Sequence, residues 1–259
     1  MNAIIALANV VIKELYRRKD FYVLLILTVL VTLTLAFGNF FNDSRINGYL
    51  KEICLRLIWV SALVMAVGMA ARQIPAEREN RTIFPLLAKP VTRAHVIAGK
   101  FLGCWLACGI ALLVFYFFLN VVSASFEHEW HFVNYIEAIW MHWMFLAVVI
   151  AMVLLGSIIF AAPSTNATLV IILILGILLL GQHLGKLAIH QAEPQRSILY
   201  ALSFLMPHLE FFDLQDYIVF KIGLVDWKYI CRASLYGFAY TGFFLIATWI
   251  LFRRKPLSN

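Results

Sequence analysis

Six long apolar runs, separated by polar or charged segments, dominate the pattern of this chain. Each run is close to the roughly 20 residues that an α-helix needs to cross a bilayer. The runs lie at about 21–37, 54–71, 96–121, 138–161, 168–186 and 229–252. The pattern predicts an all-α integral membrane protein with six transmembrane helices, organised as one transmembrane domain over residues 1–259.

Ahead of the first run, residues 2–18 have a different pattern. Polar residues recur there at helical spacing and form one stripe, namely Asn2, Asn9, Lys13 and Arg17. The remaining positions are mostly Ala, Ile, Leu and Val, so a helix would be amphipathic. We expect this segment to lie in the membrane interface and not to cross the bilayer.

The basic residues give the topology. They gather in segments 13–19, 72–100 and 253–255, whereas segment 122–137 contains no Lys or Arg. Because basic residues concentrate on the cytoplasmic side, we expect both termini and the loop 72–93 to be cytoplasmic. The chain is then a multi-pass protein of the cell's inner (plasma) membrane.

The segments between the other runs are expected to lie outside. Residues 38–53 are polar and mixed in charge, and residues 122–137 are acidic, so both are predicted to be hydrated outer loops. Segment 187–228 is not simply polar, since Ile198 to Met206 is apolar but too short to cross. We predict short re-entrant or interfacial helices there, before the last span.

Composition supports a chain solvated by lipid. Hydrophobic residues make up 63% and charged residues 14%, against roughly 45–50% and about 25% in soluble domains. The net charge of +7 comes from bases beside the apolar runs, so it does not indicate a nucleic-acid partner. The four cysteines lie in or beside apolar runs and are expected to be buried thiols: Cys54, Cys104, Cys108 and Cys231. Cys104 and Cys108, four residues apart, leave a metal or redox role open.

Motifs of enzymes are missing from the sequence. There is no Gly-x-x-x-x-Gly-Lys-Ser/Thr loop, no His-Glu-x-x-His and no Gly-x-Ser-x-Gly. We therefore predict no catalytic, cofactor-binding or metal residue and no enzymatic activity in this chain. The middle of each run also lacks acidic residues, which disfavours an ion-coupled carrier. The cluster Glu127, His128, Glu129 and His131 could bind copper or zinc, or could simply be a hydrated loop.

The stretch from Arg72 to Arg93 is the densest charged segment. It contains alternating charges from Glu77 to Arg81 and prolines at 75, 85 and 90. Pro75 suits a first helical turn, and Pro85 should end or kink that helix, so we predict two short helical pieces, the first from Pro75 to about Phe84. This stretch either docks a soluble partner or is a solvated loop that fixes topology. Just after it, Gly99-x-x-x-Gly103 predicts close approach by another helix.

These residues resemble a known family. Glu77-Arg-Glu-Asn-Arg-Thr-Ile-Phe-Pro-Leu-Leu-Ala-Lys-Pro-Val-Thr-Arg93, followed by Gly99-Lys-Phe-Leu-Gly103, is similar to the cytoplasmic loop of type-2 ABC exporter permeases. Met206-Pro-His-Leu-Glu-Phe-Phe-Asp-Leu214 resembles the outer segment of that family. Within the family the chain is most similar to permeases of the nitrous oxide reductase maturation type. It departs from the pattern at Arg81, where Gly is common.

The resemblance implies a permease subunit that pairs with a second copy of itself and with a cytoplasmic ABC ATPase subunit. ATP and Mg²⁺ would be bound by that ATPase subunit, and hydrolysis would drive export or membrane-associated handling of an unknown substrate. The ATPase-coupling residues of the loop would be Glu77, Arg78, Glu79, Asn80, Arg81, Thr82 and Ile83. Two alternatives stay open, an ATP-independent secondary carrier and a membrane anchor or assembly factor.

Overall fold

The structure is a computed structural model of the chain. It describes residues 2–17, 22, 26, 29–30, 33, 44–79, 92–127, 132–189 and 193–254. Within these ranges the regular elements are all helical, which confirms the predicted all-α class.

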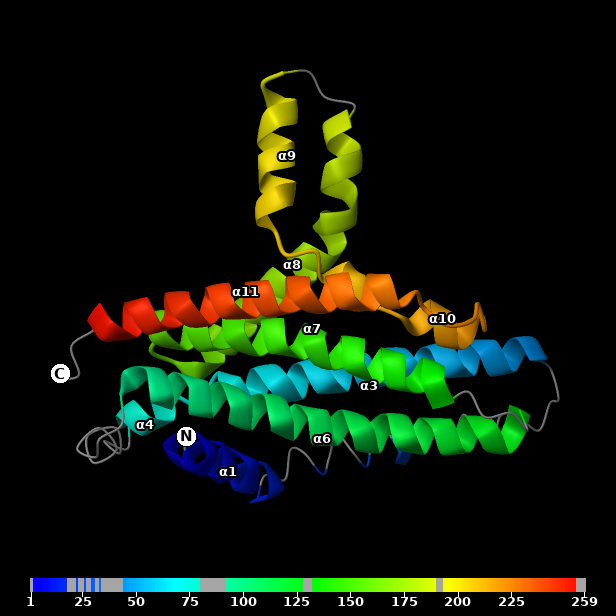
Figure 1. Ribbon diagram of the computed structural model, residues 1–259, viewed down its shortest axis with the longest axis horizontal. Coiled ribbons are helices and arrows are strands. Elements are labelled where there is room, and N and C mark those ends of the chain that lie inside the picture. Colours follow the sequence, from blue (N-terminus) through cyan, green and yellow to red (C-terminus); the bar gives the residue numbers. More distant parts are fainter. Residues whose placement is uncertain are drawn as a thin grey trace.

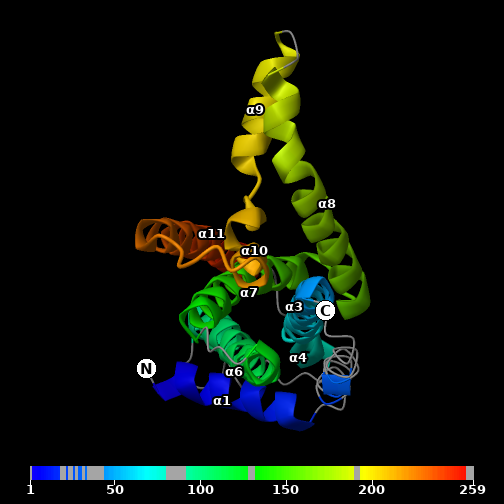
Figure 2. The same ribbon diagram turned by 90° about the vertical axis from the view of Figure 1, so that its right-hand side faces the viewer.

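Four long helices run side by side and a fifth leans away from them (Figures 1 and 2). The helices that lie side by side are α3 (Ser44–Ala70), α6 (Arg93–Glu127), α7 (Phe132–Ile159) and α11 (Trp227–Arg254). The leaning helix is α8 (Pro163–Ile189). Helix α7 is apolar on almost every side and contacts all the others, so it forms the core of the bundle. Met141, Met144 and Phe145 are among its fully buried side chains.

Five of the described helices are long and apolar enough to cross a membrane. They correspond to the second through sixth predicted spans. The predicted span at 21–37 falls mainly outside the described residues; those of its positions that are described, such as Tyr22 and Leu30, are helical. The count of six therefore stays a prediction.

The amphipathic N-terminal segment forms α1 (Asn2–Arg17), which lies across the bundle beneath α6 (Figure 2). Its polar residues Asn9 and Lys13 are exposed, whereas Ala8 and Val11 are buried against α6. The prediction of an amphipathic helix is confirmed. Its placement in the membrane interface stays a prediction.

Two predicted outer loops are largely helical, which corrects the expected boundaries. Helix α3 begins at Ser44, inside the segment 38–53, and α6 and α7 cover most of segment 122–137. A helix keeps its backbone hydrogen bonds in water as well as in lipid, so it continues past the apolar run that predicts it.

The predicted hydrated loop also contained Glu137, and this expectation is wrong. Glu137 lies on α7 and is 5% exposed. Its Oε2 accepts a hydrogen bond from the backbone N–H of Val225 at 3.2 Å, which satisfies one of the two buried carboxylate oxygens.

Pro163 lies at the junction between two membrane helices. Helix α7 ends at Ile159, and Pro163 is the first residue of α8. Proline loses no helical hydrogen bond in the first turn, so the position is favourable. Asn166, in that first part of α8, donates to the Val153 carbonyl at 3.0 Å and joins the two helices.

Short helices precede the last span, as predicted. They are α9 (Gln195–Leu205), the 3₁₀ helix η2 (Leu209–Phe212) and α10 (Gln215–Val219). Helix α9 packs against α8, and the pair protrudes from the bundle (Figure 1). Their depth in the membrane stays a prediction.

All four cysteines lie within the described residues, and none forms a disulfide. Cys54, Cys104 and Cys108 are buried as expected. Cys231 is exposed, which corrects the expectation of burial, because it lies on the outward face of α11 and not in the bundle core.

Candidate functional site

The charged stretch begins with a tight turn that leads out of α3. Backbone hydrogen bonds from Ala71 to the Val67 carbonyl and from Ala76 to the Arg72 carbonyl connect α3 to α4 (Pro75–Glu79). Pro75 is the first residue of α4, as predicted, and Ile74 in the turn is 1% exposed. The turn is therefore packed into the bundle, and α4 has a fixed origin.

An ion pair attaches α4 to α6. The Lys100 Nζ lies 2.6 Å from Glu77 Oε1 and also donates to Gln73 Oε1 at 3.0 Å. The side chains of Lys100 and Glu77 are only 8% and 17% exposed. Removing one partner of such a pair strands a charge in a poorly solvated place. The link is thus expected to hold α4 and α6 together when either helix moves.

The far end of the charged stretch is attached to α11. The Arg93 side chain donates to the backbone carbonyls of Phe252 and Arg253, the latter at 3.0 Å. The guanidinium also lies over the Phe252 ring, 5.3 Å from its centroid. A cation beside carbonyls near the C-terminal end of a helix interacts favourably with the helix dipole. Arg93 therefore joins the start of α6 to the last turn of α11.

The start of α6 is also capped locally. The Thr92 hydroxyl accepts a hydrogen bond from the His95 backbone N–H at 3.3 Å, and the Thr92 N–H donates to His95 Nδ1 at 3.3 Å. This reciprocal arrangement resembles a capping box, with His in the place usually held by Glu or Gln. It fixes the direction in which the charged stretch enters α6.

Helix α1 meets the same part of α6. A Cβ added at Gly99 would lie 2.7 Å from Leu7 Cβ, and one added at Gly103 would lie 2.7 Å from Val11 Cβ. The predicted close approach at Gly99-x-x-x-Gly103 is confirmed, and the approaching helix is α1. We call Arg93–Gly103 the α6 hub, because it contacts α1, α4 and α11.

The predicted coupling residues are placed unevenly. Glu77 points into the bundle toward Lys100. Arg78 and Glu79 belong to α4. The other four lie outside the described residues: Asn80, Arg81, Thr82 and Ile83. The second helical piece predicted after Pro85 lies outside them as well, and so do His128, Glu129 and His131 of the possible metal cluster.

Sequence reasoning missed the partners of the charged stretch. A lysine one residue after Gly99, at the start of an apolar helix, could have indicated a buried ion pair for Lys100. Arg93 gave no comparable signal, because its partners are backbone carbonyls 159 and 160 residues further along the chain. Over the described residues, no group of three or more His, Cys, Asp or Glu side chains is arranged to hold a metal ion.

Beyond the α6 hub, the interface between α6 and α7 also contains polar contacts. Trp105 and Trp143 stack at 4.2 Å, and each indole N–H donates to the backbone carbonyl of the other residue. Deeper in the bundle, the Tyr116 hydroxyl and His142 Nδ1 are 3.2 Å apart. Trp143 thus packs between α6 and α7. These contacts join helices and do not form a catalytic constellation.

The fold and this arrangement define a multi-pass helical membrane protein. Residues 44–255 match the model of the ABC-2 family transporter proteins, and the chain belongs to this family. It is thus a transmembrane permease component of an ABC transporter. The matched region runs from α3 through α11 and includes α4 and the α6 hub, while α1 precedes it. A search of curated proteins finds no match.

Proposed function

We propose that this chain is a permease subunit that receives the movement of a separate cytoplasmic ABC ATPase through residues 77–83. The main support is the ion pair between Glu77 and Lys100, which links α4 directly to a membrane helix. Members of the ABC-2 family generally pair with such an ATPase, and this chain carries no P-loop. ATP and Mg²⁺ are then bound by the partner subunit.

The link gives a physical route for coupling. An ATPase that binds α4 differently in two nucleotide states shifts the permease between two conformations by its difference in binding free energy. Because α4 is joined to the α6 hub, displacement of α4 is transmitted to α6. Arg93 passes it on to α11, and the glycine contacts pass it on to α1. Three membrane-associated helices thus respond to one docking event.

The proposed topology follows from the position of the basic residues. Helix α4 and the C-terminal end of α11 lie at the same end of the bundle (Figure 1), where Arg93, Lys100, Arg253 and Arg254 also gather. Positively charged ends favour the cytoplasmic side. We place this end, with both termini, in the cytoplasm of a cell bounded by the inner (plasma) membrane.

The proposed assembly contains two copies of the permease and two ATPase subunits. The proposed activity is export or membrane-associated handling of a substrate. The charged loop and residues 206–214 favour the permeases of the nitrous oxide reductase maturation type as the nearest subgroup. The competing functions, a carrier working alone or a membrane anchor, are outcomes of the test below.

The test is co-purification of an ATPase subunit with the full chain, followed by ATPase assays. In the double variant Glu79→Ala with Arg81→Ala, we expect bound ATPase to fall at least about tenfold, as for loss of about 1.4 kcal/mol or more at a docking surface. The matched control is Glu193→Ala with Arg196→Ala, two exposed residues just before and near the start of α9. Like the test variant, this double variant removes one acid and one base and leaves the net charge unchanged. Equal binding by both variants would reject docking at this loop. Transport by the chain without any ATPase would favour the carrier, and neither transport nor an ATPase partner would favour the anchor.

A further inference from the structure

A surface groove of about 510 Å³ lies at the C-terminal end of α11, which is drawn red in Figure 1. The described residues that line it all come from the last two turns of that helix: Trp249, Ile250, Arg253 and Arg254. Residues four apart on a helix lie one above the other, so the two arginines follow the two apolar residues on one face. We call these four residues the α11 groove.

The two halves of the groove differ in chemistry. Trp249 and Ile250 form an exposed apolar wall within the membrane span, and the exposed Arg253 and Arg254 follow at its end. The Arg253 guanidinium lies over the Trp249 ring, 5.9 Å from its centroid, and this cation–π contact holds the charge beside the wall. A phospholipid presents an acyl chain and then a phosphate in the same order along the bilayer normal.

The charges of the groove are not neutralised within the described part of the protein. Neither Arg253 nor Arg254 forms an ion pair with a carboxylate there, and Glu77, at the same end of the bundle, is already paired with Lys100. The carbonyls in the last turn of α11 receive hydrogen bonds from Arg93, a side chain of α6. Two guanidinium groups are therefore available to an anion from outside the chain.

We propose that the α11 groove binds an anionic phospholipid. Arg253 and Arg254 hold the phosphate, because planar guanidinium groups match phosphate oxygens in geometry and charge. Trp249 and Ile250 cover the beginning of an acyl chain. A soluble phosphate would leave this apolar wall uncovered, so both halves of the groove together favour a lipid. The proposal does not rest on docking of an ATPase, since no groove residue belongs to the stretch 77–83.

The proposal is tested by lipid binding to the purified full chain in neutral detergent, titrated by native mass spectrometry or thermophoresis. We expect short-chain phosphatidylglycerol to bind at least about tenfold more tightly than short-chain phosphatidylcholine, because two cations favour a net negative headgroup. Arg253→Gln with Arg254→Gln should raise the Kd for phosphatidylglycerol at least about tenfold.

The matched control removes two other exposed bases of the same helix. Lys228→Gln with Arg232→Gln changes the net charge equally, four residues apart near the other end of α11, and should leave the Kd within about twofold. Trp249→Leu keeps both arginines and should raise the Kd about threefold, as for loss of an exposed cation–π contact.

Inorganic phosphate is the probe for a soluble anion. It has no chain to cover the apolar wall, so we expect it to bind at least about tenfold more weakly than phosphatidylglycerol. Binding as tight as that of the lipid would overturn the proposal. So would equal binding of phosphatidylglycerol and phosphatidylcholine, or equal Kd values for phosphatidylglycerol in the two double variants.

Discussion

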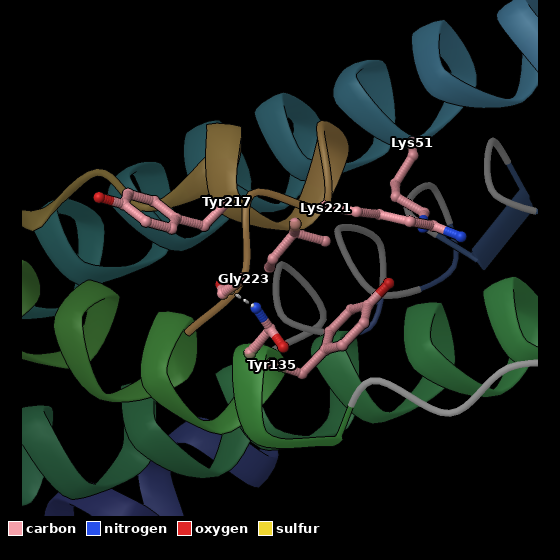
Figure 3. Close-up of a pocket in the computed structure, with 7 residues that line it drawn as sticks. Lys51, Tyr135, Tyr217, Lys221 and Gly223 are labelled. Carbon is pink, nitrogen blue, oxygen red and sulfur yellow. Dashed lines mark hydrogen bonds between the residues drawn. The ribbon is translucent and has the colours of Figure 1, made fainter. Parts of the chain in front are cut away.

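The two ends of the bundle use charged residues in different ways. At the α4 end, Lys100 is paired with Glu77 and Arg93 is bound to carbonyls of α11, so the basic groups join helices. At the opposite end, beside a small pocket lined in part by Tyr135 (Figure 3), the α7 side chains of Asn134 and Glu137 hydrogen-bond to the backbone of the turn that precedes α11. The difference is that charged side chains join whole helices at the α4 end, whereas at the opposite end α7 holds the backbone of a turn.

The largest expected effect comes from breaking the ion pair of the α4 end. In Glu77→Ala, the ammonium of Lys100 loses its carboxylate in a place that is 8% exposed. We expect the free energy of unfolding to fall by about 3 kcal/mol. Unfolding in mixed micelles, followed by circular dichroism, measures this change. Glu193→Ala removes an exposed acid and serves as the control. Equal stability of the two variants would mean that the pair is not a structural link.

A second, smaller effect is expected from crowding the contact between α1 and α6. In Gly103→Ala the new Cβ would lie 2.7 Å from Val11 Cβ and 3.0 Å from the backbone of Ala8. Overpacking of this kind costs about 1–3 kcal/mol. Limited proteolysis of α1 should accelerate accordingly.

The matched control for this contact is Gly68→Ala, since an added Cβ there meets nothing within 4 Å. It should be neutral or stabilise the chain by up to about 1 kcal/mol, because alanine is the better helix former. If Gly103→Ala behaves like Gly68→Ala, α1 does not pack on the hub.

The smallest effect is expected at the pocket end. Asn134→Ala removes the hydrogen bond to the Gly223 carbonyl and should cost about 1 kcal/mol. Hydrogen exchange should quicken in residues 221–226 while the α6 hub keeps its protection. Equal loosening at both ends would show that the two regions are not independent.

Much of the helical plan could be predicted from the sequence. The polar stripe predicted α1, Pro75 predicted the start of α4, and Gly99-x-x-x-Gly103 predicted a close helix contact. Each of these signals is local, since it depends on residues within one continuous stretch of at most 16 residues. That is why the sequence alone was sufficient for them.

The contacts that build the site are of another kind. Arg93 contacts Phe252 of α11 across 159 residues of sequence, and Glu137 contacts Val225 from a segment predicted to be a loop. Such pairs depend on how the helices pack, and no periodic pattern encodes their partners. Helix ends were also misjudged, because hydropathy marks the part of a helix that favours lipid and not the point where its hydrogen bonds end.

The central claim is that Glu77 acts through Lys100 and transmits the movement of the ATPase. The direct test is the charge swap Glu77→Lys with Lys100→Glu, compared with Glu77→Ala and wild type in ATPase stimulation by the reconstituted complex. A pair that acts as a link should be restored by the swap to within about threefold of wild type, whereas Glu77→Ala should lose about tenfold or more. If the swap is as inactive as Glu77→Ala while the ion pair re-forms and the protein is folded, Glu77 contacts the ATPase itself and the account of the link is wrong.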